Sequence, residues 1–235
     1  MGHRILSYHS IGSAVEGDIL SLYNMPVSQF KQQIAMLLEM SAADPRLKPT
    51  ALNNGLDQGV SLTFDDGYTN ALTLVAPSLN ALRIPFSVFI SRSLVKSGDK
   101  RYLSESQIRE LATIDGVSLG THGLNHSPLT TLDSEMLEVS LRESRLWLED
   151  VIQKPVACMS YPFGALSRKV VTATDKAGFR FAACSLWGFN DVRTPALELR
   201  RLDMWSGDSQ HDFRAKLCGT WNWLRLTQPS WMKAR

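Results

Sequence analysis

Residues 60–67 read Val-Ser-Leu-Thr-Phe-Asp-Asp-Gly, an apolar run that ends in two carboxylates and a glycine. Continuous apolar runs of this length are typical of strands that are buried on both faces of a parallel sheet. A second run, residues 117–121, precedes His122 and His126, and a third precedes Tyr161–Gly164. The sequence therefore predicts several strands whose ends carry polar side chains.

Apolar and helical patterns alternate along most of the chain. Short apolar runs predict strands at residues 4–8, 60–64, 86–90, 117–121, 156–160 and 179–184. Helical periodicity between them predicts helices at residues 28–40, 68–82, 104–116, 133–151 and 167–177, with Ser104 and Gln107 as a capping box. Alternating strands and helices favour a parallel sheet covered by helices, and the number of repeats suits a barrel.

The polar clusters contain the donor atoms of a hydrolytic metal centre. One carboxylate and two imidazoles can hold a zinc-like ion and leave a position open for water, while the second carboxylate is free to act as a base. His122 and His126 are four residues apart, so on a helical turn they would share one face. Gly123 stands where an H-E-x-x-H motif has its glutamate, so the base must come from elsewhere.

Each cluster alone has an ordinary structural explanation. Asp-Asp-Gly between apolar segments is usually a turn, and two histidines four apart are often solvated or buried in a core. Together, Thr63–Gly67, Thr121–Leu129 and Tyr161–Gly164 resemble, in this order, the motifs of the polysaccharide deacetylase family, also called carbohydrate esterase family four. The opening Ile5–Ile11 resembles the first strand of its poly-N-acetylglucosamine deacetylase branch.

The resemblance covers roughly residues 4–205 and implies an α/β fold, a distorted, incomplete (β/α)₇ barrel in a single domain. In barrels of this class, the loops that leave the C-terminal strand ends build the active site. We expect residues 1–212 to form the barrel and residues 213–235 to form a basic, tryptophan-rich C-terminal helix or tail.

By resemblance, one divalent ion, expected to be Zn²⁺, is held by Asp66, His122 and His126, and Asp65 is the general base. This division agrees with physical chemistry, because a carboxylate on a dication loses basicity whereas its neighbour can accept a proton. The resemblance also implies that the third motif forms the substrate and oxyanion site, with the Phe163 N–H as the oxyanion donor; its residues are Tyr161, Pro162, Phe163 and Gly164.

Two further roles depend on residues outside these motifs. An acid must protonate the departing amine; we choose His9 over its rival His211, because His9 follows the first predicted strand. The third motif usually begins with an arginine that orients the base, but Ser160 stands there in this chain. Arg201 is the candidate replacement; Arg200 and a plain surface role for Arg201 remain open.

The implied activity is metal-dependent removal of N-acetyl groups from sugars of a polysaccharide or a lipid-linked glycan precursor, with Trp187 available to stack on a sugar face. Core packing is the more common role of such a residue. The alternatives are an amidohydrolase of a small non-sugar substrate, a catalytically weak carbohydrate-binding barrel, and an iron oxygenase site, which would leave Asp65 without a role.

Charge and cysteines limit partners and location. The 235 residues carry a net charge of +2 at pH 7, too small to indicate nucleic-acid binding. The start of the chain has no apolar signal core and the three cysteines form no C-x-x-C pair, so we expect a cytoplasmic protein.

Residues 213–235 contain five cationic side chains, three tryptophans and no acidic residue. Peripheral contact with the inner membrane surface is one explanation, and a last helix with buried tryptophans is the other.

Overall fold

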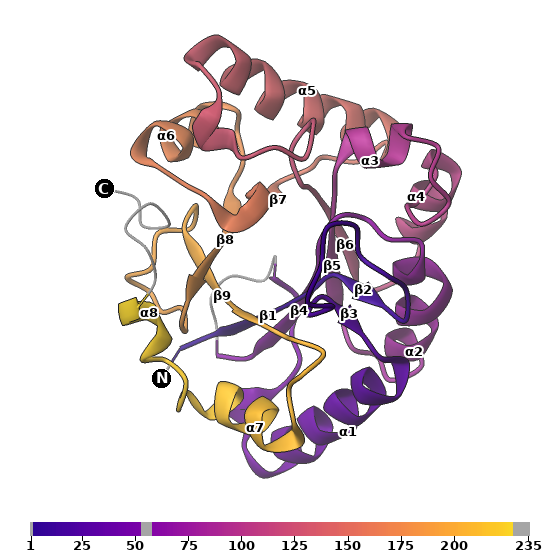
Figure 1. Cartoon of the computed structure of the whole chain (residues 1–235), viewed down its shortest axis with the longest axis vertical. Coiled ribbons are helices and arrows are strands. Elements are labelled where there is room, and N and C mark those ends of the chain that lie inside the picture. Colours follow the sequence, from indigo (N-terminus) through magenta and orange to yellow (C-terminus); the bar gives the residue numbers. More distant parts are fainter. Residues whose placement is uncertain (1, 53–57, 228–235) are drawn as a thin grey trace.

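Seven parallel strands form a closed barrel in the computed structural model, which describes residues 2–52 and 58–227 (Figure 1). In order around the barrel, the strands are β1 (Arg4–Tyr8), β4 (Val60–Phe64), β5 (Phe86–Ile90), β6 (Val117–Thr121), β7 (Cys158–Ser160), β8 (Phe181–Trp187) and β9 (Leu199–Asp203). Strand β9 pairs with β1 through Leu6 with Leu202 and through Ser7 with Asp203. The seven-stranded α/β barrel expected from the sequence is therefore confirmed.

Distortion of the barrel is concentrated around β7 and β8. Strands β6 and β7 are paired only at Thr121 and Met159. Strand β8 loses its register with β9 between Ala183 and Trp187. Residues 188–198, which connect β8 to β9, contain no helix.

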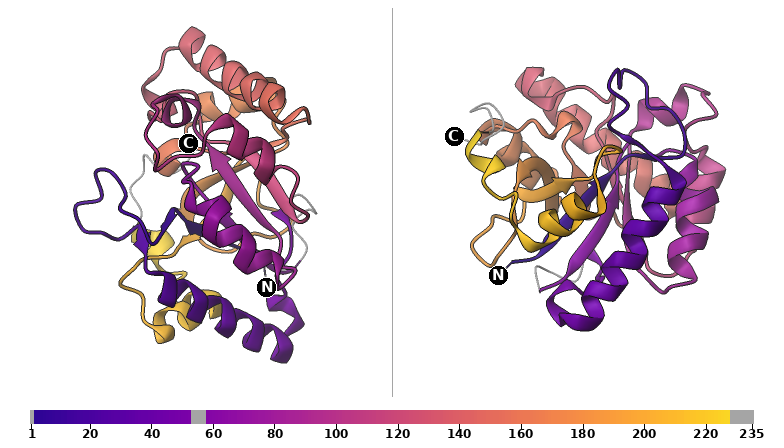
Figure 2. Two further views of the ribbon diagram at one scale, coloured as in Figure 1. Left: turned by 90° about the vertical axis from the view of Figure 1, so that its right-hand side faces the viewer. Right: turned by 60° about the horizontal axis from the view of Figure 1, so that its bottom comes forward.

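Helices cover the outside of the barrel (Figures 1 and 2). They are α1 (Val27–Ala43), α2 (Ala76–Asn80), α3 (Arg92–Lys96), α4 (Glu105–Leu111), α5 (Ser134–Ile152), α6 (Arg168–Lys176), α7 (Gln210–Cys218) and α8 (Leu224–Thr227). The capping box predicted at the start of α4 is present, with both the Ser104 and the Gln107 side-chain bonds formed. None of these helices is long and apolar enough to cross a membrane.

The helix predicted over residues 68–82 differs from the structure. A π-helical turn, η3 (Ala71–Val75), comes first, and the short helix α2 follows it. Pro77 explains part of this change, because proline has no N–H to bond the carbonyl four residues earlier. Wide π-turns of this kind accommodate such a break in the helical hydrogen bonds.

Helix α7 packs against the barrel near the start of β1. Phe213 and Leu217 are fully buried, and the Arg4 Nε at the start of β1 donates to the Leu217 carbonyl over 2.9 Å. The helix begins at Gln210, so the domain boundary expected at residue 212 falls inside it.

A projecting loop borders the carboxyl ends of the strands (Figure 2). It connects two short paired strands, β2 (Ser10–Ile11) and β3 (Asn24–Met25). The Ser206 N–H, in the segment that follows β9, donates to the Leu22 carbonyl over 2.8 Å. The loop is therefore attached to the segment after β9.

Candidate active site

Asp65 and Asp66 lie in the turn that follows β4. The Asp65 N–H donates to the Tyr8 carbonyl of β1 over 2.9 Å, which continues the pairing between the two strands. Asp66 and Gly67 then take left-handed φ angles of 70° and 78°. Such angles are uncommon for a residue with a side chain, although aspartate tolerates them better than most. The two adjacent carboxylates reach different partners as a result of this turn.

Asp66, His122 and His126 form a cluster whose ligand atoms all lie within 4.8 Å of one another. The Asp66 Oδ1 atom is 3.4 Å from the His122 Nε2 atom and 3.0 Å from the His126 Nε2 atom. This oxygen is buried, and by the geometric criteria for a hydrogen bond it has no partner among the described residues. A buried, unsatisfied carboxylate oxygen that faces two imidazole nitrogens fits a divalent, zinc-like ion.

The tautomer of His122 suits metal binding. Its Nδ1 atom lies 2.9 Å from the Ser160 carbonyl, which can only accept, so Nδ1 carries the proton and Nε2 keeps a free electron pair. Metal-binding histidines commonly have such a second partner. Burial lowers the pKa of His122, which favours the neutral ring that a metal needs. For His126, burial alone would lower the pKa, but the Asp66 carboxylate raises it above its ordinary value.

The two histidines do not share a helical turn, so this prediction from their spacing was wrong. Strand β6 ends at Thr121, and the following residues form a non-helical loop. Gly123 and His126 have φ angles of 74° and 45°, which interrupt any right-handed helix. The loop nevertheless brings the rings together, with centroids 5.2 Å apart.

Asp65 is held by a buried arginine from the last strand. The Arg201 Nη1 and Nη2 atoms each donate to one Asp65 oxygen over 2.8 Å, and both side chains are 2% exposed. Burial would raise the pKa of Asp65, but Arg201 and then His122 lower it well below its ordinary value. Asp65 is therefore a carboxylate at neutral pH. The structure thus brings the candidate arginine to the expected base, while Arg200 makes no such contact.

Ser160 is a site residue whose contacts the sequence did not predict. Its hydroxyl donates to Asp65 Oδ2 over 3.1 Å, and its carbonyl accepts from His122. One residue therefore contacts both the expected base and an expected metal ligand. The only signal in the sequence was its place in the third motif, where the family usually has arginine.

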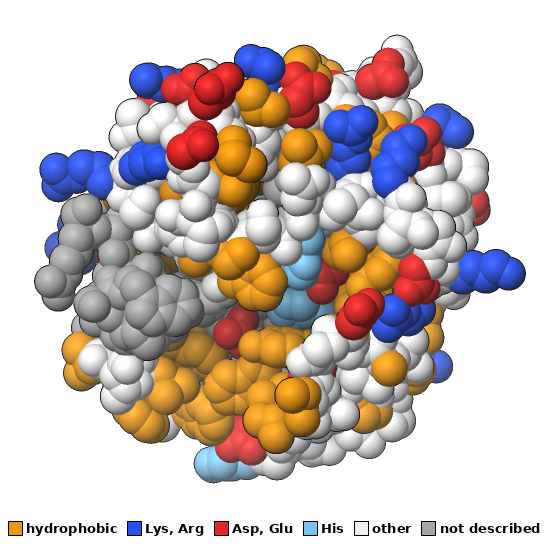
Figure 3. Space-filling model, turned by 45° about the horizontal axis from the view of Figure 1, so that its top comes forward, with side chains coloured by type: hydrophobic (Ala, Val, Ile, Leu, Met, Phe, Trp, Pro, Cys, Tyr) orange, Lys and Arg blue, Asp and Glu red, His pale blue; other side chains and the backbone are white. Residues whose placement is uncertain are grey.

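His9 and His211 lie in different places. His9 follows β1 and packs against Tyr23, with ring centroids 4.4 Å apart, and a positive charge on it would lower the pKa values of Asp65 and Asp66. Its buried Nδ1 atom has no hydrogen-bond partner in the described part of the chain. His211 is an exposed residue in the first turn of α7. Figure 3 shows histidine and acidic side chains together near the middle of one face, beside an apolar depression.

Only one residue of the third motif is exposed. Tyr161 is fully buried, and its hydroxyl donates to the Leu197 carbonyl over 2.9 Å. Pro162 and Gly164 are also buried, and a Cβ atom on Gly164 would clash with the Ser185 side chain. Phe163 is 55% exposed, has a φ of 58° and packs its ring against that of His126, with centroids 5.1 Å apart. The part of this motif that can meet a substrate is therefore at Phe163.

Trp187 is buried in an aromatic cluster with Trp205 and Trp221, with centroid distances of 6.0 and 6.2 Å. A sugar could stack on Trp187 only if these neighbours moved. The Lys216 Nζ atom lies 4.1 to 5.5 Å from the three ring centroids and pairs with the Asp208 carboxylate at 2.5 Å. Lys216 is fully buried, so this cation of the C-terminal tail cannot contact a membrane.

Comparisons with known proteins agree with the motifs. The family model described as polysaccharide deacetylase matches residues 53–182. The Bacillus subtilis (strain 168) protein YxkH is 26% identical over 182 residues, which cover 75% of this chain and 62% of YxkH. The chain thus spans less than two thirds of that relative.

Solved structures that share the fold include PplD and IcaB. The deacetylase PplD from Streptococcus pyogenes, solved in complex with acetate, is 19% identical with a TM-score of 0.76, covering 92% of this chain and 98% of PplD. IcaB from Ammonifex degensii is 17% identical with a TM-score of 0.75, covering 95% of this chain and 97% of IcaB. At these identities the likeness shows a shared barrel.

Proposed function

The chain belongs to the polysaccharide deacetylase family, and from this premise we propose that it is a metal-dependent hydrolase that removes N-acetyl groups from N-acetylated sugars. The observation that carries the proposal is the different surroundings of two adjacent carboxylates. Asp66 faces two imidazole nitrogens, whereas Asp65 faces Arg201 and Ser160. One carboxylate is therefore suited to metal binding and the other to proton transfer.

The ligands in this proposal are Asp66, His122 and His126. A divalent ion bound there would polarise the acetyl carbonyl and make a water molecule more acidic. We propose zinc as the ion, because two imidazoles and one carboxylate are a ligand set of catalytic zinc sites.

Asp65 accepts the proton of the attacking water in this mechanism. Arg201 fixes the orientation of the carboxylate with two parallel hydrogen bonds and keeps it ionised. The same guanidinium lowers the pKa of Asp65, which makes the carboxylate a weaker base. The base is thus well positioned and always available, and its weakness must be offset by the acidity of the water.

His9 gives a proton to the departing amine nitrogen, and the Phe163 N–H stabilises the negative charge that develops on the acetyl oxygen. Two observations support His9 as the acid. It lies directly after β1, and a positive charge on it would lower the pKa values of Asp65 and Asp66. Phe163 supports the second because it lies beside His126 at the exposed edge of the site. The sugar would belong to a polysaccharide or to a lipid-linked precursor.

Acetate release from a panel of N-acetylated sugars, with and without a chelator, tests this function. We expect release from the wild-type protein, loss with chelator and recovery after zinc is restored. Asp65→Asn should keep its metal but lose a factor of about 10² or more in turnover. Asp115→Asn, which changes an exposed carboxylate, is the matched control. Normal turnover by Asp65→Asn, or undiminished release with the metal removed, would contradict the proposal.

A further inference from the structure

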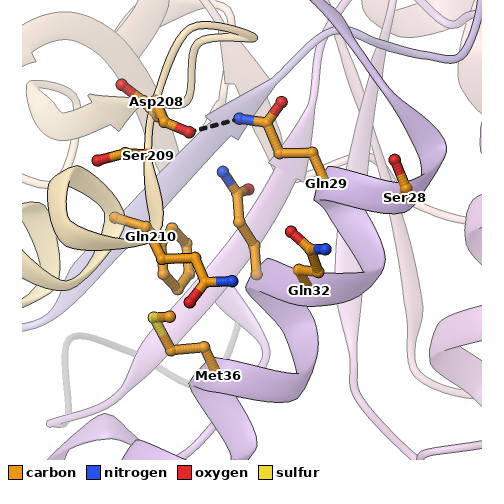
Figure 4. A pocket seen from close by; sticks show the side chains of 9 residues that line it. Ser28, Gln29, Gln32, Met36, Asp208, Ser209 and Gln210 are labelled. Carbon is orange, nitrogen blue, oxygen red and sulfur yellow. Dashed lines mark hydrogen bonds between the residues drawn. The ribbon is translucent and has the colours of Figure 1, made fainter.

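A cavity of about 220 Å³ lies between helices α1 and α7 on the outside of the barrel (Figure 4). Four of the residues that line it are glutamines, which are Gln29, Gln32, Gln33 and Gln210. None of the residues proposed for catalysis or metal binding lines this cavity. It is therefore separate from the site described above.

Gln33 is a buried side chain with an unmet hydrogen bond in this cavity. It is 4% exposed; its Oε1 atom accepts from the Tyr8 hydroxyl over 2.8 Å, while its Nε2 atom has no partner among the described residues. Exchanging the amide oxygen and nitrogen would let the hydroxyl accept instead, but Oε1 would then have no partner. In both orientations one buried polar atom needs a partner, and leaving it unpaired is costly.

The cavity has hydrogen-bonding groups but no unpaired charge. No lysine or arginine is among the described residues that line it. Its one carboxylate, on Asp208, pairs with Lys216 and accepts from the Trp205 N–H over 2.9 Å. The Asp208 carbonyl is occupied as well, since it accepts from Gln29 Nε2 over 2.7 Å. An ionic ligand would therefore find no free countercharge there.

The remaining groups suit a neutral ligand that both donates and accepts. Figure 4 shows Gln32 and Met36 from α1 and Gln210 from α7 around the same space. Each carboxamide offers donors and an acceptor, and a hydroxyl group can use both. A space of about 220 Å³ can hold one sugar ring. The Met36 side chain adds an apolar surface for the carbon atoms of such a ring.

We propose that this cavity binds a single neutral sugar unit, independently of the metal centre. The proposal goes beyond deacetylation, because binding here requires neither a metal nor turnover. A glycan held at this second site would stay attached to the enzyme while other units of the chain reach the metal centre.

Nuclear magnetic resonance of protein labelled with ¹³C at the methionine methyl groups tests the proposal on the full chain. The Met36 signal, assigned with Met36→Leu, is followed while N-acetylglucosamine is added to metal-free protein. We expect a saturable shift of this signal. The double variant Gln32→Ala/Gln210→Ala should weaken binding about tenfold, as expected for two lost hydrogen bonds. The control Lys31→Ala, an exposed residue of α1 that does not line the cavity, should stay within twofold of wild type.

Three results would overturn the proposal. They are an unmoved Met36 signal, equal affinity in the double variant and the wild type, and a saturable shift with inorganic phosphate in place of the sugar. Since the protein carries no metal in this experiment, a protein without deacetylase activity would still show the Met36 shift if the cavity binds sugar. The two proposals can therefore fail separately.

Discussion

The ion pair between Arg201 and Asp65 makes a sharp prediction for the variant Arg201→Met. This change removes two charge-assisted hydrogen bonds to Asp65 and one from the Arg201 Nε atom to the Cys184 carbonyl. The remaining Asp65 carboxylate would be 2% exposed, with Ser160 as its hydrogen-bond donor. Removal of one partner from a buried ion pair typically costs about 3–5 kcal/mol. We expect a loss of this size in the free energy of unfolding.

This loss measures the cost of an unpaired buried carboxylate and not the net contribution of the pair. Urea unfolding of metal-free protein should give it directly, provided that the dependence on urea concentration is unchanged. In an Asp65→Asn background, the same Arg201→Met change should cost less, because no negative charge is left unpaired. Arg200→Met is the control; its half-buried side chain does not contact Asp65, so its loss should be smaller than about 1 kcal/mol.

The effect should also depend on pH in a defined direction. Arg201 helps to hold the pKa of Asp65 below its ordinary value, so the stability that this ionisation contributes is present above about pH 4 and is lost in more acidic solution. Without Arg201, burial raises the pKa of Asp65, so the variant takes up a proton at a higher pH than the wild type does, and the difference between the two proteins should shrink as the solution becomes more acidic. A loss below about 1 kcal/mol at neutral pH, or one that grows in acid, would refute the reasoning.

Three further predictions concern the metal, the acid and the C-terminal tail. Metal analysis of His122→Ala and of His126→Ala should find no bound metal. Full metal occupancy in both variants would show that these histidines are not the ligands. His9→Ala should slow amide substrates far more than activated aryl acetates, whose leaving groups need no proton; equal losses, or a large loss in His211→Ala alone, would contradict that role. If the tail holds a cytoplasmic enzyme at the inner membrane surface, wild type should float with anionic vesicles at low salt, and binding should fall in the variant that replaces Trp223, Trp231 and Lys233. Absence of flotation, or equal flotation of both proteins, would mean that the tail has a structural role and does not bind the membrane. Trp231 and Lys233 lie outside the described residues.

The barrel and the cluster of Asp66 with two histidines were accessible from sequence because both depend on local patterns. Strands buried on both faces read as continuous apolar runs, as in residues 60–64 and 86–90. The polar residues directly after such strands meet at one end of a parallel barrel, whatever the details of the loops. This is why Asp66 and His122 could be placed near each other from two separate motifs.

Contacts that depend on side-chain packing were not accessible in the same way. The spacing of His122 and His126 suggested a helical turn, but left-handed angles at Gly123 and His126 fix a loop instead. Trp187 was offered as a sugar-stacking residue with core packing as the more common role, and Lys216 was one cation of the basic tail. The structure buries both, with the Lys216 Nζ atom 5.5 Å from the Trp187 ring centroid. Such arrangements depend on contacts between segments that are far apart in the sequence, which periodicity does not reveal.

Arg201 lies in β9, the last strand of the barrel to be synthesised. The ion pair with Asp65 can therefore form only late in synthesis of the chain. Asp65, the proposed base, directly follows the second strand of the barrel, whereas Arg201 lies on the seventh, 136 residues later in the chain. A growing chain can already contain all three proposed metal ligands while Asp65 still lacks its counterion. Full activity would then begin only when β9 has docked between β8 and β1. A newly synthesised chain would therefore stay inactive until the barrel is closed.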